Sequence, residues 1–147
     1  MRRPLAIFIC ATLAATPLAA QTINFGDDSS EWPNDGECDD RRFIGSGMAL
    51  DLDNDDTGSD ASDCMSLFNE GRISLVDPVR GQQVTQCDAI DFGNDTSEWA
   101  KDGECDDPRF DGLGSASVIM RDDLLRDATD CRSACTRGSI WLRVSGE

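Results

Sequence analysis

The sequence contains no histidine and no tyrosine, and it is poor in basic residues, with 13 Lys and Arg against 29 Asp and Glu and a formal net charge of −16. Without histidine it lacks the commonest general base and a preferred zinc ligand. A surface this acidic repels nucleic acid and anionic lipid, and it suits cations or basic proteins. The composition therefore excludes nucleic acid as a partner and argues against an enzyme.

Long apolar runs are also missing, apart from a short one at the start of the chain. Arg2 and Arg3 form a basic segment, an apolar stretch follows from Leu5 to Leu13, and small residues continue up to Ala20. This order is typical of a signal peptide, and the stretch is shorter than the roughly 20 residues that a membrane-spanning helix needs. We predict a signal peptide over residues 1–20, no membrane span, and a secreted or periplasmic protein.

Six cysteines follow the predicted signal peptide, at positions 38, 64, 87, 105, 131 and 135. An even number of cysteines in an exported protein is typical of disulfide bonds. Six cysteines allow 15 pairings, so their number alone does not fix the connectivity.

An internal repeat organises the chain. Residues 23–75 align with residues 90–142 at a constant offset of 67, without gaps, and 28 of the 53 aligned positions are identical. We therefore divide the mature chain into copy 1 (residues 21–76), a polar connector (residues 77–89) and copy 2 (residues 90–147).

The repeat also selects a disulfide pattern. Cys38 and Cys64 correspond to Cys105 and Cys131, so each copy is expected to close its own bridge, which leaves Cys87 to pair with Cys135. Each bridge within a copy would stabilise the fold by roughly 3–4 kcal/mol. A module of this size needs such help because its apolar core is thin.

The local pattern predicts a small disulfide-rich α+β fold, in which each copy is a loop-rich module with a short helix and short strands. Many Gly, Asp, Asn and Ser residues predict loop and turns over residues 23–47. The expected helices cover residues 61–68 and 124–135, and the expected strands cover residues 48–52, 73–76, 117–120 and 140–144. The predicted small core of each copy consists of Phe25, Trp32, Phe43, Ile73, Leu75 and their counterparts Phe92, Trp99, Phe110, Ile140 and Leu142. The tryptophans have an alternative role as surface anchors for a partner.

Acidic residues that recur in both copies are the candidate metal ligands. Asp35, Glu37 and Asp39 alternate, so an extended loop would direct them to one side. If the second segment is helical, Asp56, Asp60 and Asp63 fall at i, i+4 and i+7 on one face. The full candidate set is Asp35, Glu37, Asp39, Asp40, Asp56, Asp60, Asp63, Asp102, Glu104, Asp106, Asp107, Asp123, Asp127 and Asp130.

A bridge between Cys38 and Cys64 would draw these two acidic segments together. Two carboxylates about 4 Å apart repel each other by ~4 kcal/mol at an effective dielectric constant of about 20. A hard cation between them reverses the sign, and calcium fits best because it takes 6–8 oxygen ligands. Gly36 and Gly103 would allow a main-chain carbonyl to turn inward. Zinc or copper would require histidine or free thiolate.

Other readings of the acids stay open. Acidic runs are commonly solvated surfaces, Asp caps helices and turns, and Arg42 and Arg109 could each neutralise one acid. Asp53 to Gly58 matches the first half of an EF-hand loop but lacks the closing Glu, so a turn is the better interpretation. Paired carboxylates can also catalyse acid–base chemistry, but we find no nucleophile–base pair and no phosphate-binding loop.

The stretch E-W-x-x-D-G-E-C-D-D-x-R-F followed by D-A-T-D-C resembles a short acidic tandem repeat of exported bacterial proteins, and the resemblance covers both copies. The Trp-x-x-Asp-Gly-x-Cys pattern is also similar in style to the calcium cages of LDL-receptor class A and Notch-type modules. Those modules carry more disulfides per copy than the single bridge expected here, so they serve as a physical analogy.

The sequence thus predicts an exported, non-catalytic, calcium-binding tandem module. We expect it to mediate protein interaction in the periplasm or cell envelope, with another exported protein or an envelope component as its partner. The alternative is a metal-independent, disulfide-stapled interaction or inhibitor-like protein that uses its acidic surface.

Overall fold

The computed structural model describes residues 22–146. The predicted signal peptide and its cleavage site before Gln21 lie outside these residues. No helix in the described part of the chain combines the length and the apolar character that crossing a membrane requires.

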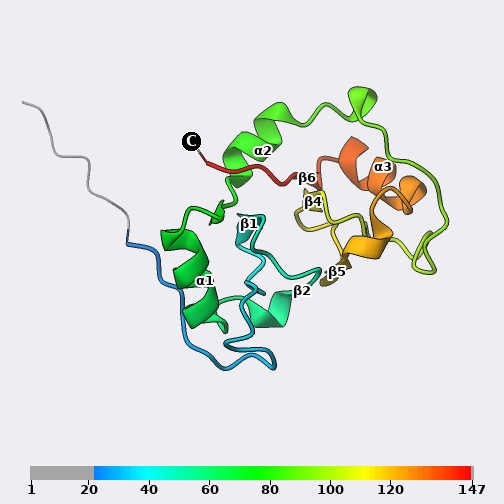
Figure 1. The fold of residues 1–147 in the computed structure, drawn as a ribbon. Coiled ribbons are helices and arrows are strands. Elements are labelled where there is room, and N and C mark those ends of the chain that lie inside the picture. Colours follow the sequence, from blue (N-terminus) through cyan, green and yellow to red (C-terminus); the bar gives the residue numbers. More distant parts are fainter. Residues whose placement is uncertain (1–21, 147) are drawn as a thin grey trace, which may run out of the picture.

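Residues 22–146 form a small disulfide-rich α+β fold (Figure 1). The helices are α1 (Ala61–Asn69), α2 (Pro78–Val84) and α3 (Ala128–Thr136), and short 3₁₀ turns cover Asn54–Asp56, Cys87–Ala89 and Arg121–Asp123. The strands are β1 (Phe43–Gly45), β2 (Asp51–Asp53), β3 (Ile73–Leu75), β4 (Phe110–Asp111), β5 (Val118–Met120) and β6 (Trp141–Leu142).

The strands of the described residues pair as three antiparallel ribbons of two strands each. β1 pairs with β3 inside copy 1, and β4 pairs with β6 inside copy 2. The third ribbon joins the copies, since β2 pairs with β5 and Leu52 stands opposite Ile119. Residues 52 and 119 are 67 apart, so each strand pairs with its own counterpart in the sequence repeat.

All three predicted disulfides are present: Cys38–Cys64, Cys87–Cys135 and Cys105–Cys131. Disulfides of this kind fit an oxidising, extracytoplasmic environment. The Cys87–Cys135 bridge has no counterpart in copy 1, where Phe68 occupies the position equivalent to Cys135. The Phe68 ring instead packs edge-on against the rings of Phe25 and Phe43, so an aromatic cluster replaces the bridge.

The predicted core is confirmed for its phenylalanines and isoleucines but is wrong for its tryptophans and for Leu75, which is exposed. Phe43, Phe92, Phe110, Ile73 and Ile140 are buried, and Phe25 is half-buried. The tryptophan side chains remain exposed instead, 57% for Trp32 and 46% for Trp99, because the loops that carry them stay at the surface. A further apolar cluster of Leu52, Ala116 and Ile119 lies where the copies meet.

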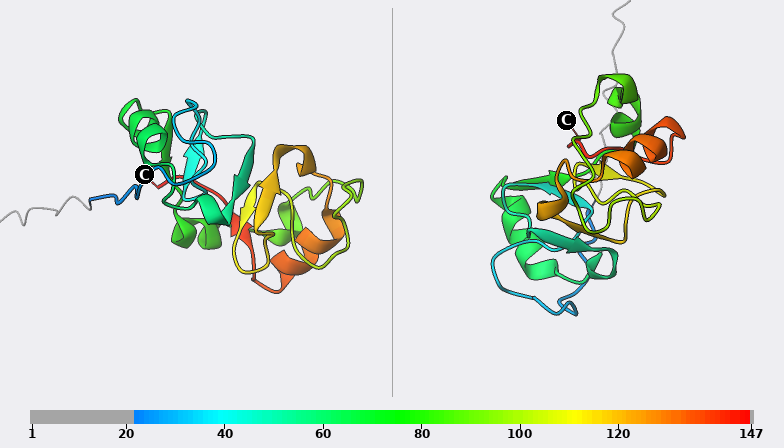
Figure 2. Two further views of the ribbon diagram at one scale, coloured as in Figure 1. Left: turned by 90° about the horizontal axis from the view of Figure 1, so that it is seen from below. Right: turned by 90° about the vertical axis from the view of Figure 1, so that its right-hand side faces the viewer.

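Two buried arginines join the copies from opposite sides. Nη1 of Arg41 donates a 2.7 Å hydrogen bond to the carbonyl oxygen of Ala116 in copy 2. Nη2 of Arg143 donates to the carbonyl oxygens of Arg41 and Phe43 in copy 1, at 3.0 and 2.8 Å. The chain end beyond β6 therefore runs back from copy 2 to copy 1, as Figure 2 shows.

The connector is more ordered than its polar composition predicts. Asp77 accepts a hydrogen bond from the N–H of Arg80, and Pro78 occupies the first turn, which together start helix α2. Gly81 faces the main chain of Leu142 and the ring of Trp141, so a larger side chain there would clash with β6.

The predicted helix over residues 124–135 is too long. The chain forms a 3₁₀ turn over Arg121–Asp123, and α3 begins only at Ala128. The matching turn in copy 1 ends at Asp56, and Gly58 follows with a φ of 75°. No single helix therefore runs from Asp56 to Asp63, and Asp56, Asp60 and Asp63 do not share one helix face. The N–H of Gly58, in the break between the turn and α1, donates a hydrogen bond to Asp40.

Candidate metal centre

The two acidic segments of copy 1 lie against each other, as the sequence predicts. The Cys38–Cys64 bridge fastens them, and the N–H of Asp39 donates a 2.9 Å hydrogen bond to Oδ2 of Asp60. A second contact of 3.2 Å runs from the N–H of Gly36 to Oδ2 of Asp63. These contacts bring the loop over residues 35–40 against the first turn of α1.

The same contacts recur 67 residues later. The N–H of Asp106 donates to Oδ2 of Asp127 at 2.9 Å, and the N–H of Gly103 donates to Oδ2 of Asp130 at 3.1 Å. The Cys105–Cys131 bridge holds the pair of segments in place. Identical residues thus produce identical local geometry in both halves of the sequence repeat.

In copy 1 the residue that caps helix α1 is distant in sequence from the N-cap position. Asp60 stands at the N-cap of α1, yet its side chain makes no capping hydrogen bond. Asp28 caps the helix instead, since it accepts hydrogen bonds from the N–H and the hydroxyl of Ser62 at 2.8 and 2.7 Å. These bonds lower the pKa of Asp28. Because Asp28 satisfies the helix end, the carboxylate of Asp60 is free to face the acidic loop.

Copy 2 repeats this arrangement. Asp95 accepts from the N–H and the hydroxyl of Thr129, both at 2.7 Å, and these bonds lower the pKa of Asp95 to about 2. Asp127, at the N-cap of α3, makes no capping bond.

In each copy the facing carboxylates, Asp39 and Asp60 in copy 1 and Asp106 and Asp127 in copy 2, form an acidic cluster with the acids around them. Each cluster contains buried carboxylate oxygens without a hydrogen-bond partner. Asp39 and Asp60 are 5% and 0% exposed, and Oδ2 of the first and Oδ1 of the second have no partner. The equivalent atoms in copy 2, on Asp106 and Asp127, are unpartnered too, as is Oδ2 of Asp123. A buried acceptor without a donor destabilises the fold by roughly 1–3 kcal/mol, so these oxygens require a counterpart.

Burial and mutual repulsion raise the pKa values of these acids. Burial raises the pKa of Asp39 to about 7, with further contributions from the charges of Asp60 and Asp35. Burial likewise raises the pKa of Asp60 to about 6, although the N–H of Asp39 opposes the shift. A positive charge inside the cluster would act in the opposite direction.

The pKa values in copy 2 shift in the same way. Burial, together with the charges of Asp102 and Asp127, raises the pKa of Asp106 to about 7. The pKa of Asp127 rises to about 6, again chiefly through burial.

The remaining predicted ligands surround these buried pairs at different depths. Asp56, Asp63 and Asp130 are half-buried, and Asp123 is buried. The exposed members of the set are Asp35, Glu37, Asp102 and Glu104. Exposed carboxylates next to buried ones can complete a coordination sphere from the solvent side.

Asp40 and Asp107 belong to the candidate ligand set, but they follow the alternative in which Arg42 and Arg109 each neutralise one acid. Both oxygens of Asp40 accept hydrogen bonds from the guanidinium of Arg42, and Oδ2 also accepts from the N–H of Gly58. Arg109 holds Asp107 in the same manner. Since their charge is already balanced, these two aspartates serve as structural ion pairs.

The sulfur atoms nearest the clusters are not available as ligands. Cys38, Asp60 and Cys64 present atoms within 4.8 Å of one another, and Cys105, Asp127 and Cys131 do the same. In both groups the two sulfurs are joined in a disulfide. The ligand atoms that remain are carboxylate oxygens, which suit a hard cation.

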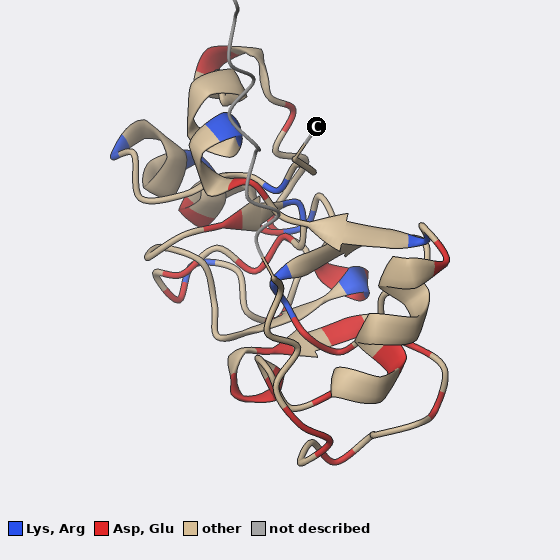
Figure 3. Ribbon diagram, turned by 90° about the vertical axis from the view of Figure 1, so that its left-hand side faces the viewer, with Lys and Arg blue, Asp and Glu red and all other residues tan. Residues whose placement is uncertain are grey.

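A solvent-open hollow of about 550 Å³ adjoins the cluster of copy 1. Its acidic lining consists of Glu31, Asp35, Glu37, Asp39, Asp51, Asp53, Asp55 and Asp56. Sequence reasoning omitted Asp51 and Asp53 because copy 2 has Val118 and Met120 in their places. Figure 3 shows acidic residues recurring along the loops of this part of the chain.

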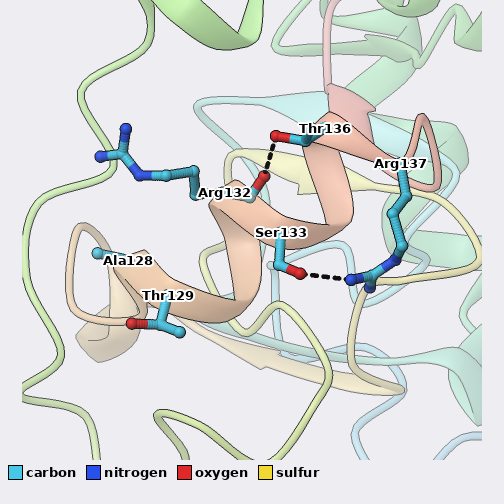
Figure 4. A pocket seen from close by; sticks show the side chains of 6 residues that line it. All are labelled: Ala128, Thr129, Arg132, Ser133, Thr136 and Arg137. Atoms are coloured by element: carbon cyan, nitrogen blue, oxygen red, sulfur yellow. Dashed lines mark hydrogen bonds between the residues drawn. The ribbon is translucent and has the colours of Figure 1, made fainter.

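A second hollow lies on α3 and has the opposite character. It is lined by Arg132 and Arg137 together with small and hydroxylated residues (Figure 4). Arg132 lies over the ring of Phe92, and Arg137 donates to the hydroxyl of Ser133. Both guanidinium groups thus already have contacts of their own, and the acids of the two clusters lie elsewhere.

Comparison of the chain with protein-family models, curated proteins and solved structures finds no match.

Proposed function

We propose that this chain is an exported, non-catalytic calcium-binding module in tandem, with one ion in each copy. The observation that carries the proposal is the pair of buried carboxylate oxygens without partners, Asp39 Oδ2 and Asp60 Oδ1, which recurs at Asp106 and Asp127. An ion placed against these oxygens would satisfy them and offset the repulsion between like charges.

The donor atoms favour calcium over other metals. The chain has no histidine, and the sulfurs beside the clusters are bridged, which disfavours zinc and copper. Magnesium demands a compact octahedral set, whereas calcium accepts six to eight oxygens in flexible arrangements. A cluster that mixes buried, half-buried and exposed carboxylates matches the looser requirement.

The contacts shared at an offset of 67 residues support an origin of the two copies by duplication. Disulfide, distant helix cap and buried carboxylate pair recur together, which is a more specific agreement than sequence identity alone. In this proposal an ion in each cluster helps to stabilise its copy, because each copy has only a small apolar core.

A role in protein interaction follows from what remains on the surface. Trp32 and Trp99 are exposed on the loops that carry the clusters, and exposed tryptophan is enriched at binding sites. The disulfides and the predicted signal peptide support a partner among exported proteins or components of the cell envelope.

The test is thermal unfolding of the mature chain after removal of metal by a chelator. Addition of calcium chloride at constant ionic strength should raise the melting temperature, and magnesium chloride should raise it less. Isothermal titration should give two calcium ions per chain. A melting temperature that responds to neither chelator nor calcium would eliminate the proposal.

One observation favours a metal-independent alternative. Because the pKa values of Asp39 and Asp106 are about 7, protons can neutralise the clusters without any ion. The protein would then be a disulfide-stapled interaction or inhibitor-like module that uses its acidic surface. Isothermal titration with calcium chloride distinguishes the two functions. The metal-independent alternative predicts no saturable heat of calcium binding.

A further inference from the structure

The two clusters differ in their third acid. Asp123 is 6% exposed, and its Oδ2 is buried without a partner. Its counterpart Asp56 is half-buried and has no such atom. Copy 2 therefore presents three buried, unpartnered carboxylate oxygens, on Asp106, Asp123 and Asp127, whereas copy 1 presents two.

The surroundings of Asp56 explain why it stays in contact with water. Asp56 lines the solvent-open hollow together with Trp32 and Val118. A hydrated carboxylate has to lose water before it can bind an ion, whereas a buried, unpartnered one has already lost it.

The charges around the clusters differ as well. Copy 1 carries Asp51 and Asp53 on the rim of its hollow, where copy 2 has Val118 and Met120. Exposed charges attract cations over a distance, but at 0.15 M ionic strength this attraction fades beyond about 8 Å. Asp51 and Asp53 thus make calcium binding in copy 1 more sensitive to salt, but they leave the site open to solvent.

We infer that the two copies hold calcium unequally: copy 2 binds a tightly held structural ion, and copy 1 binds an exchangeable ion beside the exposed Trp32. This inference rests on the proposed function. It assigns the two sites different roles, because only the ion of copy 1 would follow changes in the calcium concentration outside the cell.

The experiment is isothermal titration of the chelator-stripped mature chain with calcium chloride at 0.15 M ionic strength. We expect two binding steps whose dissociation constants differ at least tenfold. The matched variants D106N and D39N should abolish the tight step and the weak step, respectively. Because either variant could fold poorly, the wild-type titration is repeated at 0.5 M ionic strength, where the weak step should lose more affinity than the tight one.

Tryptophan fluorescence assigns the steps independently. In the W32F variant the weak step should lose its fluorescence signal while the heat of binding persists, and W99F should silence the tight step in the same way. Two equal steps would overturn the inference but leave calcium binding intact. A weak step that belongs to copy 2 would also overturn it. Absence of both steps would overturn the proposed function as well.

Discussion

Leu52 and Ile119 stand opposite each other in the β2–β5 ribbon, and they hold the same position in the sequence repeat. Both side chains are buried in the apolar cluster between the copies. Antiparallel pairing of a segment with its own counterpart is the arrangement of a two-fold symmetric interface, here formed within one chain. The symmetry is broken by the two arginines that cross the interface, since Arg41 corresponds to Pro108 and Arg143 to no basic residue.

Replacement of Arg143 should weaken the connection between the copies. The variant R143M leaves the carbonyl oxygens of Arg41 and Phe43 without their donor, which should lower the free energy of unfolding by about 2–4 kcal/mol. Urea unfolding measures the loss. The control R72M removes an exposed pair with Glu70 at 3.9 Å and an exposed 3.5 Å hydrogen bond to the carbonyl oxygen of Ser46, and it should cost less than about 0.5 kcal/mol. Equal effects of the two variants would contradict the role of Arg143.

The Cys87–Cys135 bridge should contribute substantially to stability because it closes a long loop. The bridge closes a loop with a sequence separation of 48, and chain entropy predicts a loss of about 4 kcal/mol in the double variant C87A/C135A. Guanidinium unfolding under oxidising conditions gives the value. The two bridges within the copies remain intact in this variant, so calcium binding should persist. Loss of calcium binding would show that the bridge also shapes a cluster.

The metal-free protein should become less stable as the pH rises from 5 to 8. Asp39 and Asp106 have pKa values of about 7, and Asp60 and Asp127 have values of about 6, against an ordinary 3.8. The folded state binds these protons more tightly than the unfolded state does. The stability they provide is therefore complete below pH 3.8 and is lost as the pH rises through 7. Asp28 and Asp95 have lowered pKa values and stay ionised across this window.

Thermal unfolding of the chelator-stripped protein across this pH range checks the sign. With saturating calcium the trend should reverse, because the ion replaces the protons and binds better as the acids lose them. A melting temperature that rises with pH in the absence of metal would contradict the repulsion described for the clusters.

Replacement of Asp39 should have effects of opposite sign in the two metal states. The variant D39N removes one of the charges that repel each other, so at pH 8 the metal-free protein should gain about 1–2 kcal/mol of stability. The same variant removes a ligand, so calcium should no longer raise its melting temperature. Differential scanning calorimetry with and without calcium measures both effects.

The neighbouring residue provides the control. The variant D40N breaks the ion pair with Arg42 and should lower stability by about 2 kcal/mol whether or not calcium is present. If D39N destabilised the protein in both states as well, Asp39 would be a structural residue like Asp40.

Several features of this protein follow from the sequence alone. The offset of 67 residues fixes which cysteines are equivalent, and elimination then pairs Cys87 with Cys135. The same spacing indicates that the segments around Cys38 and Cys64 meet, because a disulfide constrains its neighbours along the chain. These conclusions depend on local spacing and on a covalent bond, and both can be read without knowledge of the packing.

Only the tertiary structure decided which carboxylates lost their water. Asp40 differs from Asp39 by one position, yet it lies beside Arg42 while its neighbour faces Asp60. Asp123 is buried whereas its counterpart Asp56 is half-buried, and both Trp32 and Trp99 are exposed, although the repeat makes these segments equivalent in sequence. Burial is the combined result of contacts between residues far apart in the chain, so local sequence does not determine it.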